Sequence, residues 1–96
     1  MKEGNNVEYR NKKLEEFNEY IKGKKVAIIG IGVSNLPLLD YFYEKAAKVT
    51  VFDNKEKEEI DKSIIEKLDR YRFNYFFGKE NLENLKGFDI IFRSPS

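Results

Sequence analysis

One segment of the chain constrains the fold more than any other, because it places a strand, a glycine turn, a helix and a second strand in succession. Residues 25–30 form an almost wholly apolar run that enters a glycine turn at residues 30–32. A short apolar run with β-branched residues predicts a central strand of a parallel sheet. Residues 34–46 then carry apolar side chains at helical spacing, and a second apolar strand at 48–53 ends on an aspartate. The segment predicts a βαβ unit.

The rest of the chain continues this alternation. Hydrophobic spacing predicts further helices at 7–22, 55–70 and 80–86 and further strands at 71–77 and 88–93. Alternating strands and helices imply a parallel sheet with right-handed crossovers. We therefore expect an α/β fold: a Rossmann-like three-layer domain with strand order 3-2-1-4, preceded by an N-terminal helix. Residues 1–23 would be a helical extension and residues 24–96 the Rossmann-like domain.

The composition excludes several classes of protein. The chain has 96 residues, which suits one domain, and it is 41% hydrophobic with a net charge of +1. This balance lacks the basic excess of a nucleic-acid-binding domain. The absence of cysteine and histidine excludes disulfides, thiolate sites and imidazole chemistry. Neither a signal peptide nor an apolar run of membrane-spanning length is visible, so we expect a cytoplasmic protein with no membrane partner.

The glycine turn and the following acid suggest a phosphate or nucleotide site. Gly30 permits a sharp turn, and Gly32 permits close approach of the backbone to a ligand. Ser34 is a good N-cap for a helix whose first N–H groups would point at that ligand. Asp53 follows at roughly the spacing, about 20 residues, at which nucleotide-binding units place an acid against the nucleoside. Asn35 stands where the dinucleotide fingerprint has its third glycine.

Three interpretations of this pattern stay open from the residues alone. The first is a site for a nucleoside diphosphate. The second is an NAD-binding domain of an oxidoreductase or regulator, which predicts a glycine at position 35. The third is an interaction module that binds no nucleotide, in which the glycine turn has only a structural role.

Three short motifs occur in an order that is known from one family. Gly30-Ile31-Gly32-Val33-Ser34-Asn35 follows the first strand, Asp53-Asn54 ends the second, and Ser94-Pro95-Ser96 follows the fourth. In these motifs the chain resembles the N-terminal domain of the Mur ligases, most closely those that add D-glutamate to UDP-N-acetylmuramoyl-L-alanine. The resemblance covers all but about the first twenty residues. The chain departs from the family pattern at Asn35 and Ser96, where glycine is commoner.

The resemblance implies that this domain holds the UDP part of that substrate. The glycine turn and Ser34 would face the pyrophosphate, Asp53 and Asn54 would face the uracil, and the Ser-Pro segment would close over the uridine diphosphate. The carboxylate would accept a hydrogen bond from the uracil N3–H. The expected UDP-binding residues are Gly30, Gly32, Val33, Ser34, Asn35, Asp53, Asn54, Lys55, Ser94, Pro95 and Ser96.

The resemblance also implies that the chemistry lies outside this chain. Mur ligases hold ATP and magnesium with a Gly-Lys-(Ser/Thr) loop in a central domain, and a third domain binds the incoming amino acid. No such triplet occurs here. We therefore expect no catalytic or metal-binding residue in the chain, and we expect it to be the inactive substrate-anchoring part of a three-domain peptidoglycan ligase. Its partners would be the substrate and the two other domains. Cell-wall growth, cell shape and cell division would depend on the parent enzyme.

Overall fold

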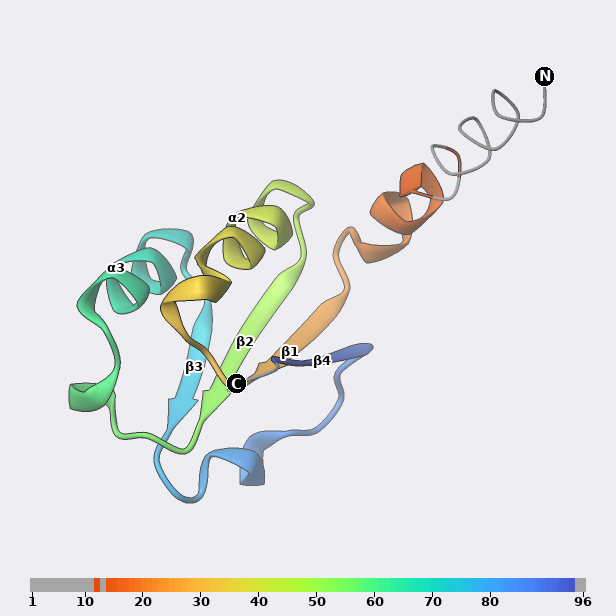
Figure 1. The fold of residues 1–96 in the computed structure, drawn as a ribbon. Coiled ribbons are helices and arrows are strands. Elements are labelled where there is room, and N and C mark those ends of the chain that lie inside the picture. Colours follow the sequence, from red (N-terminus) through yellow and green to blue (C-terminus); the bar gives the residue numbers. More distant parts are fainter. Residues whose placement is uncertain (1–11, 13, 95–96) are drawn as a thin grey trace.

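The computed structural model describes residue 12 and residues 14–94. It contains a four-stranded parallel sheet in the order β3-β2-β1-β4 (Figure 1). The strands are β1 (Lys25–Ile29), β2 (Lys48–Asp53), β3 (Asn74–Phe77) and β4 (Ile90–Arg93). A helix over residues 14–21 precedes β1, while most of the earlier part of the predicted helix lies outside the described residues. The α/β fold, its strand order and its leading helix are confirmed.

Two helices cover one face of the sheet. α2 (Leu36–Glu44) connects β1 to β2, and α3 (Lys62–Tyr71) connects β2 to β3 (Figure 1). Three 3₁₀ turns complete the described elements: η1 (Val33–Asn35), η2 (Lys57–Glu59) and η3 (Asn81–Asn84). The connection from β3 to β4 carries η3 and supplies the cover of the opposite face, where the described residues form no α-helix.

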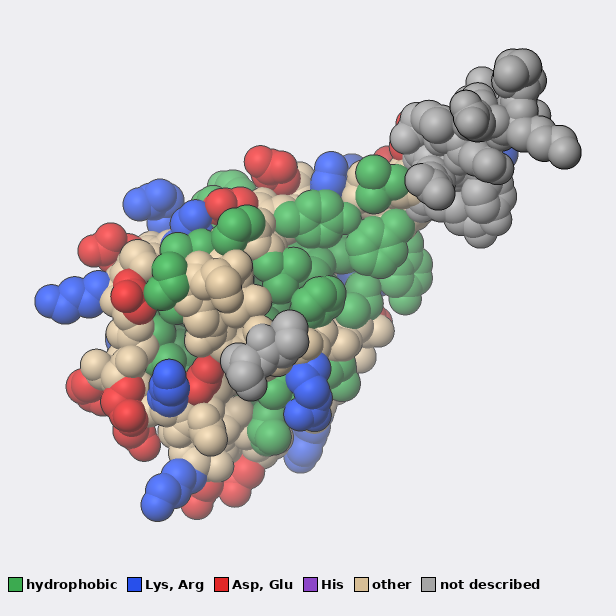
Figure 2. Space-filling view, in the orientation of Figure 1, with side chains coloured by type: hydrophobic (Ala, Val, Ile, Leu, Met, Phe, Trp, Pro, Cys, Tyr) green, Lys and Arg blue, Asp and Glu red, His purple; other side chains and the backbone are tan. Residues whose placement is uncertain are grey.

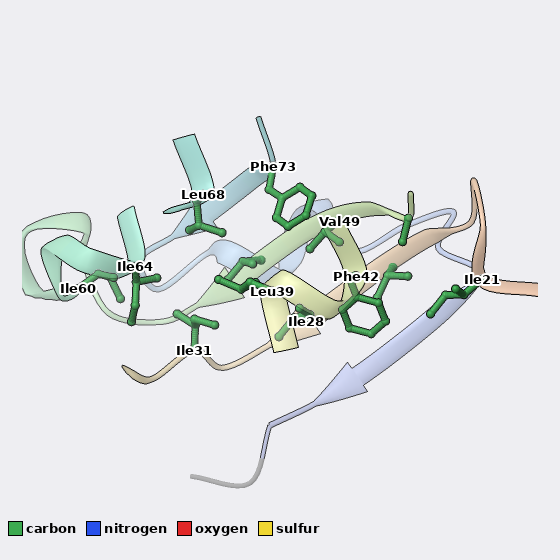
Figure 3. Close-up of a cluster of buried hydrophobic side chains, with 13 residues drawn as sticks. Ile21, Ile28, Ile31, Leu39, Phe42, Val49, Ile60, Ile64, Leu68 and Phe73 are labelled. Atoms are coloured by element: carbon green, nitrogen blue, oxygen red, sulfur yellow. The ribbon is translucent and has the colours of Figure 1, made fainter. Parts of the chain in front are cut away.

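The main core lies between the sheet and the two helices (Figure 3). Val49 and Val51 of β2 point into this core, because side chains alternate along a strand. The buried members of this core are Ile21, Val26, Ile28, Ile31, Leu39, Phe42, Ala47, Val49, Val51, Ile60, Ile64, Leu68 and Phe73. Helix α2 therefore owes its position to burial of its apolar side, each large side chain contributing about 1.5–3 kcal/mol.

The opposite face of the sheet is closed by aromatic side chains. Phe52 of β2 is completely buried, and its ring centroid lies 5.6 Å from those of both Phe76 and Phe88. Phe88 belongs to the connection that carries η3. This aromatic cluster (Phe52, Phe76 and Phe88) seals a face that has no helix over it within the described residues.

The surface shows charges of both signs and one apolar region. Acidic and basic side chains are interspersed near α3, whereas hydrophobic side chains gather between α2 and the helix before β1 (Figure 2). On that leading helix Leu14, Phe17 and Tyr20 are all exposed.

Both long helices begin later than the sequence predicts. Ser34 is not an N-cap, because it lies inside η1 and Asn35 occupies the N-cap position of α2. The predicted helix at 55–70 is divided, since residues 57–59 form η2 and α3 starts only at Lys62. Asp61 fixes that start, because its carboxylate accepts a hydrogen bond from the Ser63 N–H at 2.9 Å.

The third and fourth strands are shorter than predicted. Tyr71 ends α3, and its ring stacks on that of Tyr43 with centroids 4.0 Å apart. Arg72 then takes a left-handed conformation with φ of 60°, which ends the helix before β3 begins. The predicted helix at 80–86 is the 3₁₀ turn η3, and β4 begins at Ile90 because Phe88 packs on Phe52.

Asp40 joins α2 to α3, and this contact predicts a pH dependence of stability. Its carboxylate accepts hydrogen bonds from Lys67 Nζ, at 2.8 Å, and from the Tyr71 hydroxyl. These donors lower the pKa of Asp40 below 3.8. A carboxyl with a lowered pKa contributes stability at higher pH, and the contribution disappears as pH falls through its folded-state pKa.

We expect wild type to exceed Asp40→Asn in unfolding free energy by at most about 1 kcal/mol at pH 7, because the pair is partly exposed. The difference should shrink as pH falls below 3.8 and disappear once pH falls below the lowered folded-state pKa of Asp40. Urea unfolding from pH 7 to pH 3 measures it, with the exposed Glu66→Gln as control. A difference that grows on acidification would contradict this assignment.

Candidate functional site

A hollow of about 520 Å³ lies at the carboxyl ends of β1, β2 and β4. This volume falls within the range of small-molecule sites, and the carboxyl edge of a parallel sheet is where such folds bind ligands. Its lining combines the glycine turn, the loop after β2, part of η3 and the end of β4. The lining residues are Ile29, Gly30, Ile31, Gly32, Phe52, Asp53, Asn54, Lys55, Asn81, Leu82, Arg93 and Ser94.

Of the two glycines in the turn, Gly30 and Gly32, only Gly30 has a backbone conformation that requires glycine. Gly30 has φ of 86°, a conformation that side chains disfavour, and its N–H donates to the Phe52 carbonyl at 2.7 Å. Gly32 is extended, with φ of −134°. A Cβ at Gly32 would lie 3.6 Å from Asn35 Oδ1, an ordinary contact. A role for Gly32 in close approach of a ligand stays a prediction.

Asp53 holds the glycine turn and the loop after β2 together. The residue is buried, and its Oδ2 accepts a hydrogen bond from the Ile31 N–H at 2.9 Å. Its Oδ1 accepts one from the Lys55 N–H, also at 2.9 Å. A carboxylate has about four acceptor positions, so each oxygen keeps capacity for one more donor. The predicted contact with a uracil N3–H remains chemically possible beside this structural role.

Asn35 connects the two loops that flank the hollow. Its Oδ1 accepts hydrogen bonds from the Gly32 N–H, at 2.9 Å, and from the Ser94 hydroxyl, at 3.1 Å. A glycine at position 35 has no side chain to make either contact. The Asn35 side chain therefore links the glycine turn to the residue that follows β4.

Most N–H groups of the glycine turn already donate hydrogen bonds within the protein. The N–H groups of Gly30, Ile31 and Gly32 donate to Phe52, Asp53 and Asn35 respectively. The N–H groups of Val33 and Ser34 make no hydrogen bond to any described residue. Both residues are exposed at the start of η1. The donors that remain for a phosphate in this turn are thus fewer than the sequence suggests.

The structure brings most of the predicted site residues together. Asp53, Asn54 and Lys55 line the same hollow as the glycine turn, and so does Ser94, whose N–H donates to the Ile29 carbonyl at 2.9 Å. Val33, Ser34 and Asn35 adjoin it from η1 without lining it. Pro95 and Ser96 lie outside the described residues.

Sequence reasoning did not assign Asn81 or Leu82 as site residues. Asn81 is buried, and its Nδ2 donates to the Gly78 carbonyl at 2.7 Å, which holds η3 beside the hollow. No sequence signal marks Asn81 or Leu82, because only the crossover from β3 places them there. Arg93 was not missed, because its place at the end of the fourth strand predicts residues 93–96 as a second wall of a phosphate cleft, and Arg93 lines the hollow.

A second and larger hollow, of about 670 Å³, lies at the amino ends of the strands. It is lined by Lys25, Lys48, Arg72 and Lys86 among others. The last turns of α2 and α3 also border it, and helix carboxyl ends carry partial negative charge. Ligands of open α/β sheets bind outside the carboxyl ends of the strands, so we favour the smaller hollow as the candidate site.

The described residues also bear on metal and membrane binding. Among residues 14–94 no group of three or more acidic side chains is placed to hold a metal ion. No described helix has the length and apolar character needed to cross a membrane.

Comparison with known families gives the decisive observation. The family model described as the N-terminal domain of MurD-like Mur ligases matches residues 24–96. The chain belongs to this family. The match begins just before β1, so the MurD-like domain comprises the sheet, α2, α3 and the hollow.

Several curated relatives of this MurD-like domain are named UDP-N-acetylmuramoylalanine--D-glutamate ligase. The chain is 45% identical over 85 residues to the protein of Acetivibrio thermocellus, and 44% identical over 85 residues to that of Clostridium beijerinckii. Each alignment covers 88% of this chain and 18% of the relative. The relative from Clostridium tetani is 43% identical over 86 residues, covering 90% of this chain and 19% of its own length. No solved structure matches the chain significantly.

Proposed function

We propose that this MurD-like domain binds the UDP moiety of UDP-N-acetylmuramoyl-L-alanine for a peptidoglycan ligase that adds D-glutamate. The family and the names of the relatives support a ligase of this kind. The observation that carries the proposal is the hollow itself. It gathers the glycine turn, the Asp53–Lys55 loop and Ser94 at one edge of the sheet, although these segments lie far apart in the sequence.

The chemistry of the hollow suits a pyrimidine nucleotide. Ile29 and Leu82 give it an apolar part on which a base can lie. Asp53 offers acceptor capacity for the single ring N–H of uracil, which an adenine ring lacks. Val33 and Ser34, which follow the glycine turn, have N–H groups that make no hydrogen bond to a described residue and can serve a phosphate. Asn35, which stands in place of the third glycine of the dinucleotide fingerprint, favours UDP over NAD.

The ligase chemistry belongs to the rest of the parent protein in this proposal. The chain spans less than a fifth of the first relatives' length. It contains no Gly-Lys-(Ser/Thr) triplet, so its residues do not fit ATP and magnesium. We propose that a central domain holds both and a further domain holds D-glutamate, in a cytoplasmic enzyme. The isolated chain should neither hydrolyse ATP nor form the amide bond.

An NMR titration of the ¹⁵N-labelled chain tests the binding proposal. We expect UDP to shift the amide signals of residues 30–35 and 53–55, whereas NADH at equal concentration leaves them unchanged. Affinity should be weak, because the other domains that would enclose the substrate are not part of this chain. Shifts with NADH that exceed those with UDP would contradict the proposal and favour the dinucleotide interpretation. No response to UDP would contradict it as well.

A further inference from the structure

Arg93 occupies a position from which it can reach a ligand in the hollow. It is the last residue of β4, and its register partner is Ile29, which directly precedes the glycine turn. The side chain is exposed and lines the hollow. It makes no ion pair with any residue between 14 and 94. Its guanidinium is therefore not committed to a structural contact with a described carboxylate.

The remainder of the hollow provides little compensation for a diphosphate. Three turn N–H groups, those of Gly30, Ile31 and Gly32, already have protein acceptors. Asp53 adds a negative charge to the same hollow. At short range in a partly buried site this charge repels an anionic ligand unless a cation offsets it. A diphosphate at this turn therefore needs a positively charged side chain.

Two cations line the hollow, and their surroundings differ. Lys55 follows Asp53 by two residues and directly precedes Glu56 in the loop after β2. Those acids reduce the positive potential around Lys55. Arg93 has uncharged neighbours in sequence, Phe92 and Ser94. Arginine also presents parallel N–H donors that match two phosphate oxygens.

We propose that Arg93 is the side chain that binds the diphosphate of the nucleotide and determines the preference for a diphosphate over a monophosphate. This inference rests on the proposed function. It assigns the diphosphate to the β4 side of the hollow and the base to the side of the loop after β2. The backbone of the glycine turn then shapes the site, while Arg93 supplies its charge.

Affinity measurements with UDP, UMP and uridine test this assignment. For Arg93→Gln we expect about a tenfold or greater loss of UDP affinity, a smaller loss for UMP and none for uridine. Arg93→Lys should recover part of the UDP affinity, because it restores the charge without the paired donors. The control is Arg70→Gln, which removes the same charge from an exposed position on α3 outside the hollow. It should leave all three affinities unchanged.

Salt dependence separates an electrostatic role from a structural one. Wild-type affinity for UDP should fall more steeply with salt than that of Arg93→Gln, since screening acts on the ion pair.

Equal UDP affinity for wild type and Arg93→Gln would overturn the assignment of Arg93 and leave the proposed function standing. Three other results would also overturn the assignment of Arg93. In the first, Arg93→Gln loses as much affinity for uridine as for UDP; in the second, Arg93→Lys recovers no UDP affinity. In the third, Lys55→Gln loses UDP affinity and Arg93→Gln does not. Absence of UDP binding to the wild-type chain would overturn both proposals.

Discussion

Asp53→Ala is expected to lower the free energy of unfolding by about 2–5 kcal/mol, because it leaves one buried and one part-buried N–H group without their acceptor. The Ile31 and Lys55 N–H groups each donate to this carboxylate at 2.9 Å. Asp53 is only 8% exposed, so water cannot readily replace it. The loop after β2 and the glycine turn would then separate at the mouth of the hollow. Urea denaturation at pH 7 measures the change.

Asp89→Ala is the matched control for this prediction. Its Oδ2 also accepts one backbone N–H, from Lys25 at 2.9 Å, but the contact is exposed. We expect a loss of no more than about 1 kcal/mol there. Equal losses for the two variants would contradict the structural role of Asp53. The Asp53→Asn variant removes the charge and keeps one of the two oxygen acceptors, so it should lose less stability than Asp53→Ala. If the variant stays folded and the carboxylate accepts from uracil, its UDP affinity should fall while pyrophosphate binding does not.

Phe52→Ala is expected to cost about 3–5 kcal/mol, the usual range for deletion of a buried aromatic ring. Phe52 lies on a central strand, is completely buried and contacts the rings of Phe76 and Phe88. The opposite face of the sheet depends on this aromatic cluster, since its described cover includes no α-helix. The hollow should also lose part of its apolar lining, which includes Phe52. Thermal and urea unfolding measure the loss.

Phe76→Ala tests the same cluster at a less buried position. Phe76 is 39% exposed, so its removal should cost about half as much or less. A cost for Phe76→Ala equal to that for Phe52→Ala would contradict the account of how this face is closed.

The order of strands was predictable because hydrophobic patterns are local and crossover handedness is nearly fixed. β2 was predicted at its observed bounds, since an apolar run ends there on a single acid. Boundaries that depend on tertiary contacts were not predictable. Tyr71 continues an alternating aromatic pattern, yet it ends α3, where it stacks on Tyr43 and donates to Asp40. No local pattern reveals those two partners.

The candidate site was predictable in position but not in its internal bonding. Because carboxyl ends of parallel strands meet at one edge, Gly30, Asp53 and Ser94 were expected to lie together, and they line one hollow. The engagement of Asp53 with two backbone N–H groups depends on how closely two loops approach. The same holds for Asn35, which sequence reasoning treated as a missing glycine. In the fold it is the hydrogen-bonding link between the turn and Ser94.

The position of the uracil ring is the most direct test of the central claim. Intermolecular NOEs between the H5 and H6 protons of UDP and the protein amides would locate it in solution. The account predicts NOEs to residues 53–55, at the hollow on the carboxyl edge of the sheet. NOEs instead to residues 46–50 or 71–74, around the larger hollow at the amino edge, would contradict it.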